Sequence, residues 1–352
     1  MLRALLLLAG QHYFGRRAQE AIESLPRLPS HDGPRPAVSV IVPARDEAKR
    51  LPRLLSSLQP QMATGDELIV VDDASTDSTI EVAREYGVRL VAAGPLPGGW
   101  LGKPHACWQG SRLARNDWLL FVDADTALSQ GAVAATLGYA AKQRLDALSL
   151  LARQDLGSLW ERLLVPFAYR HYFAGHGARP TLNGQFILIS RPAYEAVGGH
   201  AAVRAEVAED VALAVALERW GLPYELVDGR RWLAVRMYNS LPAIVAGFGK
   251  NSTAFLAQRP LSGVLTAAST TLALVPYWLA LRGKNRLVRL AALLATALDI
   301  ASARRFQRSL TLQQATTESL LQPLAGVVFL AIAGRSLLGR WLKPTWKGQR
   351  LS

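Results

Sequence analysis

The chain has 352 residues, which is enough for about two domains. Half of its residues are hydrophobic and 19% are charged, so its composition is more apolar than that of a typical soluble protein. Its net charge of +13 is concentrated in residues 261–352, which hold 12 Lys and Arg against Asp299 and Glu318. Basic residues that flank apolar runs favour anionic lipid as the partner over nucleic acid, for which the sequence carries no motif. Cys107 is the only cysteine, which excludes an intrachain disulfide and a cysteine-based zinc site.

The start of the chain predicts attachment to a membrane surface rather than secretion. The apolar run at 5–9 follows Arg3, is too short to span a bilayer and lacks a convincing cleavage site. Residues 24–37 are rich in proline and polar side chains, which is typical of a linker. We therefore expect residues 1–36 to form an interfacial segment followed by a linker.

Strand-like and helix-like segments alternate after this linker. The expected strands cover 38–43, 67–71, 88–92 and 117–122, with Pro43 in the first turn, and the expected helices cover 47–59, 79–86 and 103–115. This alternation predicts an α/β fold with a mostly parallel sheet and helices on both of its faces. Ligands bind beyond the carboxyl ends of such strands, which is where the polar segments 45–47, 72–77 and 123–125 lie.

A mixed region completes this domain. It predicts a strand, a helix and two further strands, at 185–190, 209–220, 224–227 and 232–237. We therefore place one α/β domain at 37–240. The segment 158–177 is basic and aromatic, so it suits either a bilayer interface, where it could guide a lipid, or an ordinary packed helix.

The remaining residues, 241–352, predict helices that associate with a membrane. Residues 261–281 carry no formal charge and are long enough for one span. The segments 287–303 and 319–334 are weaker, and could be short spans, a re-entrant pair or interfacial helices.

Asp123 and Asp125 are the most informative pair of side chains. They follow the buried run WLLFV, and two alternate carboxylates can converge where the chain turns at the end of a strand. Hard cations such as Mg²⁺ or Mn²⁺ prefer oxygen ligands and are commonly shared between carboxylates and substrate phosphates. An isolated pair of this kind more often caps a helix, but the other acidic strand ends favour a metal that assists a nucleotide diphosphate leaving group.

Other charged residues at the same predicted edge suit a nucleotide. Asp72 and Asp73 can accept hydrogen bonds from a base or ribose, whereas residues 75–77 suit turns and helix caps. Lys103 precedes a helix and could approach a phosphate, and a solvated lysine fits its local sequence equally well. Glu47 alone would be read as an acid that complements a helix dipole.

Glu209 and Asp210 stand at the start of an otherwise apolar helix. An acid in this position can simply complement the helix dipole. It can also act as a general base that takes a proton from an acceptor hydroxyl. One such carboxylate is sufficient for inverting transfer of a sugar, whereas hydrolytic glycosidases need two.

Together these segments resemble the family 2 glycosyltransferases with the GT-A fold, over about residues 37–237. The matching segments, in chain order, are VSVIVPARDE at 38–47, IVVDDASTDST at 69–79, GK at 102–103, FVDAD at 121–125, NGQF at 183–186 and AED at 208–210. The usual asparagine of the first segment is replaced by Asp46.

The resemblance implies a UDP- or GDP-sugar donor and a role for each matching residue. Asp125 would bind the metal, Asp123 the metal or the ribose, and Asp210 would be the catalytic base. The implied nucleotide-sugar site comprises Pro43, Ala44, Arg45, Glu47, Asp72, Asp73 and Lys103, and the implied sugar and acceptor pocket comprises Asn183, Gly184 and Glu209.

The segment RMYNSLPAIVAGFGKN at 236–251 resembles a narrower bacterial subgroup linked to carotenoid and hopanoid lipids. This implies a polyisoprenoid-type lipid acceptor and a contact between Arg236 and the donor diphosphate. The QxxRW signature of processive polysaccharide synthases is missing, because Asp228 stands where its glutamine would be. A single transfer is therefore expected.

The sequence thus predicts an inverting, metal-dependent hexosyltransferase at the cell membrane, with its catalytic domain facing the cytoplasm and a membrane lipid as acceptor. Polyprenyl phosphate, or an envelope polysaccharide or glycolipid precursor, is the alternative acceptor. A non-catalytic membrane scaffold with a degenerate transferase domain is a more remote alternative, which the intact Asp123, Asp125 and Asp210 disfavour.

Overall fold

The computed structural model of the chain describes residues 2–176, 181–258, 260–338, 345–346 and 349–350. The chain divides into two compact units. The sheet unit comprises Leu25–Asp155 and Pro180–Met237, and the helical unit comprises Met1–Ser24, Leu156–Arg179 and Tyr238–Ser352.

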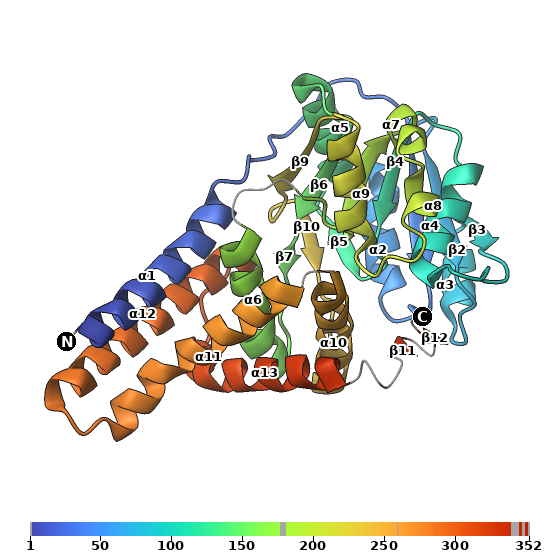
Figure 1. Cartoon of the computed structure of the whole chain (residues 1–352). Coiled ribbons are helices and arrows are strands. Elements are labelled where there is room, and N and C mark those ends of the chain that lie inside the picture. The colour runs from blue at the N-terminus through green and yellow to red at the C-terminus, as the bar shows by residue number, and fades with distance from the viewer. Residues whose placement is uncertain (1, 177–180, 259, 339–344, 347–348, 351–352) are drawn as a thin grey trace. The chain divides into compact units, whose positions relative to one another are not determined.

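A seven-stranded sheet forms the centre of the sheet unit, in the order β3-β2-β1-β4-β8-β6-β9 (Figure 1). Its strands are β1 (Val38–Ala44), β2 (Glu67–Asp72), β3 (Arg89–Ala92), β4 (Trp118–Val122), β6 (Ala147–Leu151), β8 (Phe186–Ser190) and β9 (Tyr224–Asp228). β8 runs antiparallel to both β4 and β6, and the other neighbours are parallel. The predicted α/β fold with a mostly parallel sheet is therefore confirmed.

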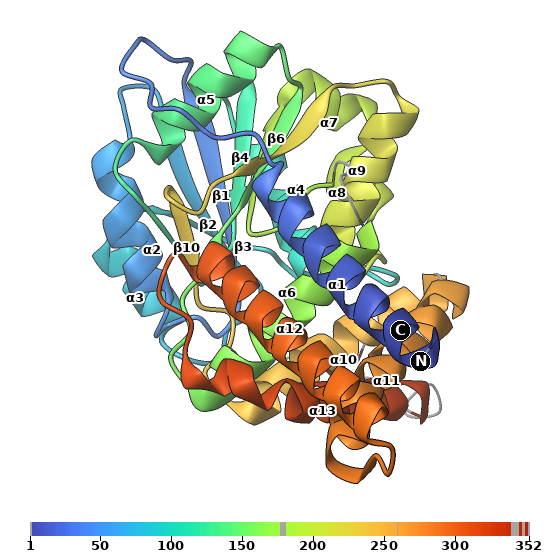
Figure 2. The ribbon, with the colours of Figure 1, turned by 90° about the vertical axis from the view of Figure 1, so that its left-hand side faces the viewer.

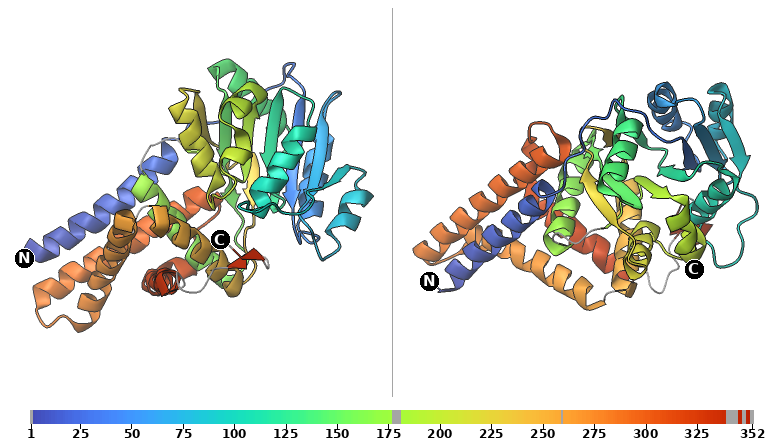
Figure 3. Two further views of the ribbon diagram at one scale, coloured as in Figure 1. Left: turned by 45° about the vertical axis from the view of Figure 1, so that its right-hand side comes forward. Right: turned by 90° about the horizontal axis from the view of Figure 1, so that it is seen from above.

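Helices cover both faces of this sheet (Figure 3). One layer contains α2 (Leu51–Leu58), α3 (Thr79–Glu85) and α5 (Ala132–Gln143), and the other contains α4 (Gly102–Leu113), α7 (Arg191–Ala196), α8 (Gly199–Ala202) and α9 (Glu209–Arg219). Side chains of a strand alternate between its faces, so Val40 and Val42 of β1 enter the first core and Ile41 enters the second. α4 packs so closely on β1 that a Cβ atom on Gly110 would lie 2.4 Å from Cγ2 of Ile41.

Two details near β1 differ from the sequence predictions. Pro43, which we expected in a turn, lies within β1 opposite Val71. The chain turns instead at Asp46, whose φ is 51°. The helix expected from residue 47 begins at Leu51, because residues 47–50 form a turn in which the Arg50 amide donates to the Glu47 carbonyl at 2.9 Å.

A small second sheet has the order β5-β10-β7. It comprises β5 (Thr126–Leu128), β7 (Arg153–Gln154) and β10 (Leu233–Val235). β5 follows directly after Asp125, and β10 pairs antiparallel with it, so that the Arg236 amide donates to the Asp125 carbonyl at 3.2 Å. β4 of the large sheet precedes Asp123 and β5 of the small sheet follows Asp125, so the two sheets together fix the backbone on both sides of the predicted metal ligands. The short helix η1 (Gln59–Gln61) completes the regular elements of the sheet unit.

The described residues of the helical unit form six long helices, with α1 alongside α12 (Figure 2). They are α1 (Leu2–Glu23), α6 (Leu159–His176), α10 (Leu241–Gln258), α11 (Pro260–Arg282), α12 (Arg286–Thr311) and α13 (Gln322–Leu338), with the short elements η2 (Thr317–Leu321), β11 (Thr345–Trp346) and β12 (Gln349–Arg350). Arg170 of α6 forms a buried ion pair with Asp299 of α12 at 2.6 Å. The Tyr277 hydroxyl donates to the same carboxylate at 2.7 Å.

Among the described residues, one stretch, Thr317–Arg335, is long and apolar enough to cross a membrane. The span expected at 261–281 lies in α11, and its first six residues are outside those whose side chains are described. Within the aromatic segment predicted at 158–177, residues 159–176 form α6, with Leu163, Leu164 and Phe173 buried as in a packed helix, and residue 177 lies outside the described residues.

Candidate active site

The carboxyl ends of the strands carry the predicted acidic residues. Asp123 follows β4, and its amide donates to the Gln185 carbonyl beside β8 at 3.2 Å. Its own carbonyl accepts from the Thr126 amide at 3.2 Å, which closes the turn into β5. Asp125 lies within this turn, so two acidic side chains are held by a rigid backbone at the edge of the sheet.

Lys103 joins three segments of the chain. Its ammonium group, at the start of α4, lies 2.7 Å from Oδ1 and 3.0 Å from Oδ2 of Asp123, and 2.9 Å from Oε1 of Glu209 at the start of α9. It also donates to the Gly184 carbonyl at 3.4 Å. The sequence left a phosphate ligand and a solvated lysine open; in the structure the Lys103 side chain is 35% exposed and pairs with two carboxylates.

Asp210 is attached to the same group of residues through Gly184. Its Oδ2 accepts from the Gly184 amide at 2.8 Å, and its Oδ1 accepts from the Val211 amide at 2.8 Å. A Cβ atom on Gly184 would lie 3.1 Å from Oδ2 of Asp210 and 3.2 Å from Nζ of Lys103, so glycine is needed at this close approach. The residues predicted in NGQF, AED, GK and FVDAD therefore meet in one place.

The charges in this site shift the pKa values of its members. Burial would lower the pKa of Lys103, but Asp123 and then Glu209 raise it well above its usual value. Burial, with the nearby charge of Glu209, raises the pKa of Asp210 to about 6. Burial and the charges of Asp123 and Glu47 raise the pKa of Asp125 to about 7. Lys103 is therefore charged at pH 7, and Asp210 can exchange a proton near that pH.

Asp125 has a buried carboxylate oxygen, Oδ1, without a hydrogen-bond partner, which suits a cation ligand. A buried polar atom without a partner is unfavourable. Within the described residues, no group of three or more His, Cys, Asp and Glu side chains is arranged to hold a metal. A divalent cation here would take further oxygen ligands from phosphates or water, as Mg²⁺ usually does. Asp123 and Asp125 therefore fit such a metal.

The other predicted nucleotide residues lie at the ends of β1 and β2. The Asp46 carboxylate accepts from the Thr76 amide at 2.7 Å, which is the main reason that its pKa lies below the usual value. Aspartate and asparagine tolerate a positive φ better than most residues, which explains an acid in place of the usual asparagine. Burial raises the pKa of Asp73, although Arg45 lies 3.4 Å away. Both oxygens of Asp72 face the Ser75 amide at 3.3 Å.

Three predicted residues form hydrogen bonds that hold the backbone around the site. The Asn183 side chain donates to the Leu150 carbonyl at 2.9 Å, so it holds the turn before β8. Ala44 is buried, and its carbonyl accepts from the Asp73 amide at 2.8 Å. The Arg236 side chain is exposed, and its backbone amide holds the Asp125 turn.

Arg50 is a residue that the sequence analysis missed. Its guanidinium donates to Glu47 at 2.9 Å, and its charge opposes the raised pKa of Asp125. The spacing of Glu47 and Arg50, three residues apart, was the available signal, but surface pairs with this spacing are common and unspecific.

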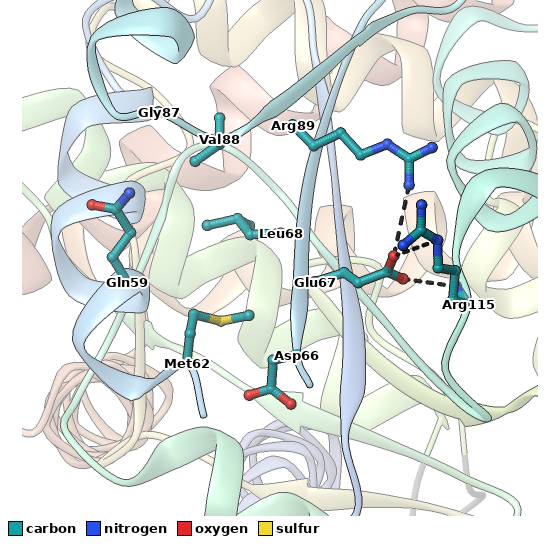
Figure 4. Close-up of a pocket in the computed structure, with 9 residues that line it drawn as sticks. All are labelled: Gln59, Met62, Asp66, Glu67, Leu68, Gly87, Val88, Arg89 and Arg115. Atoms are coloured by element: carbon teal, nitrogen blue, oxygen red, sulfur yellow. Dashed lines mark hydrogen bonds and ion pairs between the residues drawn. The ribbon is translucent and has the colours of Figure 1, made fainter. Parts of the chain in front are cut away.

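An open cavity of about 500 Å³ lies elsewhere in the sheet unit (Figure 4). It is at the amino-terminal ends of β2 and β3, opposite to the edge that carries the acidic residues. Glu67 points there towards Arg89 and Arg115, at 3.6 and 3.5 Å. The fourth charged residue of its lining, Asp66, pairs with Arg35, and none of the predicted site residues lines the cavity.

The chain is similar to known proteins over the region that contains this site. The family model described as glycosyl transferase family 2 matches residues 39–209. A 4,4'-diaponeurosporenoate glycosyltransferase of Staphylococcus haemolyticus (strain JCSC1435) is 31% identical over 229 residues, which cover 61% of this chain and 60% of the relative. The protein of the same name from Staphylococcus aureus (strain USA300) is 33% identical over 220 residues, covering 57% and 56%. The chain thus spans about three fifths of the length of these curated relatives.

A solved structure resembles the fold of nearly the whole chain. It is the mannosyltransferase PcManGT from Pyrobaculum calidifontis in complex with GDP-Man and Mn²⁺. The TM-score is 0.58, the identity is 19%, and the match covers 95% of this chain and 97% of that one. At this identity the likeness establishes a shared fold.

Proposed function

We propose that the chain, whose residues 39–209 match the model of glycosyl transferase family 2, is an inverting glycosyltransferase that moves one sugar from a nucleotide-sugar donor to a membrane lipid. One observation carries this proposal: hydrogen bonds and ion pairs link residues from four separate segments, which are Lys103, Asp123, Gly184 and the adjacent pair Glu209 and Asp210. Asp125, with its unpartnered carboxylate oxygen, follows two residues after Asp123.

The donor would be held at the carboxyl ends of β1, β2 and β4. Asp123 and Asp125 would bind Mg²⁺ or Mn²⁺, which would neutralise the charge of the nucleoside diphosphate leaving group. Asp72 and Asp73 would accept hydrogen bonds from the base or ribose, next to Pro43, Ala44, Arg45 and Glu47. The structural relative bound to GDP-Man and Mn²⁺ supports a metal-dependent nucleotide-sugar site. Arg236 follows β10 and would reach the diphosphate.

Asp210 would act as the general base. Its pKa of about 6 leaves it ionised at pH 7 and still able to accept a proton. Two backbone amides fix its orientation, which favours a near-attack geometry over a mobile carboxylate. It would take the proton of the acceptor hydroxyl during attack on the anomeric carbon, with Asn183, Gly184 and Glu209 lining the sugar and acceptor pocket. An acceptor that is already ionised at pH 7 would depend less on this residue.

A lipid acceptor is supported by the surface of the helical unit. Leu281, Leu287 and Trp278 are large apolar side chains at the connected ends of α11 and α12, and they are 80%, 73% and 63% exposed. Basic residues stand between them at Arg282, Lys284 and Arg286. Exposed leucine and tryptophan beside basic groups suit the interface of an anionic membrane.

The relatives named for 4,4'-diaponeurosporenoate favour a carotenoid-type acceptor within this class. We place the catalytic domain on the cytoplasmic side, where nucleotide sugars are made.

The direct test incubates the purified chain with radiolabelled UDP- and GDP-sugars, Mn²⁺ and lipid extracts, and identifies any labelled lipid. We expect label in an organic-extractable product that is lost in Asp125→Asn. Label in polyprenyl phosphate or in a polysaccharide precursor would replace the carotenoid-type acceptor. Absence of transfer and of metal-dependent nucleotide binding would instead favour a scaffold.

The membrane surface has its own test, sedimentation with anionic lipid vesicles. Leu287→Glu should release the chain from the vesicles. Leu113→Glu alters a partly exposed leucine of the sheet unit and should leave binding unchanged. Equal binding of both variants would refute the assignment of this surface.

A further inference from the structure

The surroundings of the Lys103 ammonium resemble those of a small hard cation. Both carboxylate oxygens of Asp123, one of Glu209 and the carbonyl of Gly184 lie between 2.7 and 3.4 Å from Nζ. An all-oxygen shell of carboxylates and a carbonyl is also what a hard divalent cation selects. The ammonium of Lys103 therefore already binds Asp123, one of the two carboxylates that we assign to the metal.

We propose that Lys103 is a tethered counter-cation: it holds Asp123 in the free protein and must release it before a metal binds there, so that metal and donor diphosphate bind together. This inference rests on the proposed function. Lys103 would then do more than contact the donor. When no nucleotide is present, it would compete with the metal for Asp123.

The arrangement of charges supports competition rather than simple pairing. The ammonium of Lys103 pairs with Asp123. Asp125, the second proposed metal ligand, keeps a buried Oδ1 without a hydrogen-bond partner. A divalent metal that bound both aspartates would meet the positive charge of Lys103 at close range, which is unfavourable in a partly buried site. The diphosphate of a donor offers the ammonium a new anionic partner. Metal and diphosphate should therefore increase each other's affinity, as reciprocal linkage requires.

Glu209 would act as a positioning residue in this arrangement. It is buried, and it provides the second carboxylate that keeps the ammonium at Asp123. It also lies next to Asp210, and without Lys103 its negative charge would repel that of Asp210. Pairing with Lys103 neutralises this charge while the donor is absent.

The experiment measures Mn²⁺ binding to the full chain by electron paramagnetic resonance of the free ion, with no nucleotide and then with UDP or GDP. In the wild type we expect weak binding of Mn²⁺ alone and at least about tenfold tighter binding with one nucleotide, a coupling of ~1.4 kcal/mol. In Lys103→Met we expect Mn²⁺ alone to bind at least about tenfold more tightly than in the wild type, and the gain from nucleotide to shrink.

Arg50→Met is the matched control. Arg50 is a nearby cation that pairs with Glu47, so its removal changes the local field without freeing Asp123. Its effect on Mn²⁺ binding should be much smaller. If both variants bound Mn²⁺ more tightly to the same extent, the effect would be one of general electrostatics and the proposal would be overturned. Unchanged or weaker Mn²⁺ binding in Lys103→Met would also overturn it.

Two further outcomes keep the test decisive. If Lys103→Met does not fold, Lys103→Gln replaces it, and binding of Mn²⁺ alone that is no tighter than in the wild type overturns the proposal. Failure of the proposed function looks different: Lys103→Met would still tighten Mn²⁺ binding, but neither UDP nor GDP would affect the wild type. Nucleotide coupling without tightening in Lys103→Met would reject the counter-cation and leave the transferase intact.

Discussion

Replacement of Asp210 by asparagine tests the chemistry of the site most closely. Each carboxylate oxygen of Asp210 accepts one backbone amide, from Gly184 and from Val211. The side-chain amide of asparagine can accept only one of these and must turn its NH₂ group towards the other. We therefore expect a loss of about 1–3 kcal/mol of stability from the unpaired donor. Because a general base typically contributes about 10²–10⁴ in rate, kcat should fall by that factor.

The assay combines transfer to a hydroxyl acceptor at saturating donor, donor binding by calorimetry and a thermal melt. Donor affinity should stay within about threefold, because a group that acts on the acceptor adds little to ground-state binding of the donor. Glu218→Gln removes an exposed carboxylate from the other end of α9 and serves as the control. A kcat for Asp210→Asn close to that of Glu218→Gln would refute the reasoning.

The remaining predictions concern pH, the metal and packing. Only ionised Asp210 accepts a proton, so kcat/KM should fall as the pH is lowered through about 6, and a profile that is flat from pH 5 to 8 would contradict this. Asp125→Asn should lose the stabilisation that Mn²⁺ with nucleotide gives in a thermal-shift assay, without loss of the folded circular dichroism spectrum. Gly110→Ala should cost about 1–3 kcal/mol in chemical denaturation, because its Cβ atom would overlap β1, whereas Gly10→Ala, with nothing within 4 Å, should cost nothing. Arg170→Met should cost about 3–5 kcal/mol, because it leaves Asp299 buried without its partner; a thermal midpoint unchanged from the wild type would show that the pair is not needed.

The sequence predicted the strands that begin the domain because they are continuous apolar runs between polar turns. β1, β2 and β4 begin and end within one residue of expectation. β6 (ALSLL) and α5 (AVAATLGYAAKQ) were not assigned, because short apolar segments without clear turn signals suit both a buried strand and a buried helix. The antiparallel direction of β8 depends on the path by which the chain returns to the sheet, which no local pattern encodes.

The sequence indicated which residues carry the candidate site better than it indicated which of them contact one another. Asp46, rather than Pro43, makes the turn after β1, because Ser75 and Thr76 from a distant loop bind its backbone and its carboxylate. Lys103 pairs with Asp123, 20 residues further along the chain, and with a second carboxylate on α9. Contacts of this kind depend on how the strands and helices are brought together. Local sequence therefore identified the participants and left their pairing open.

In our proposal, Asp123 and Asp125 after β4 bind one cation together with the donor diphosphate, beside the base Asp210 of α9. A crystal structure of the chain with UDP or GDP and Mn²⁺, with the metal located by anomalous scattering, tests this claim most directly. We expect Mn²⁺ to be coordinated by Asp125, by Asp123 and by diphosphate oxygens, with Lys103 turned from Asp123 to a phosphate. Mn²⁺ and nucleotide bound away from these aspartates would contradict it.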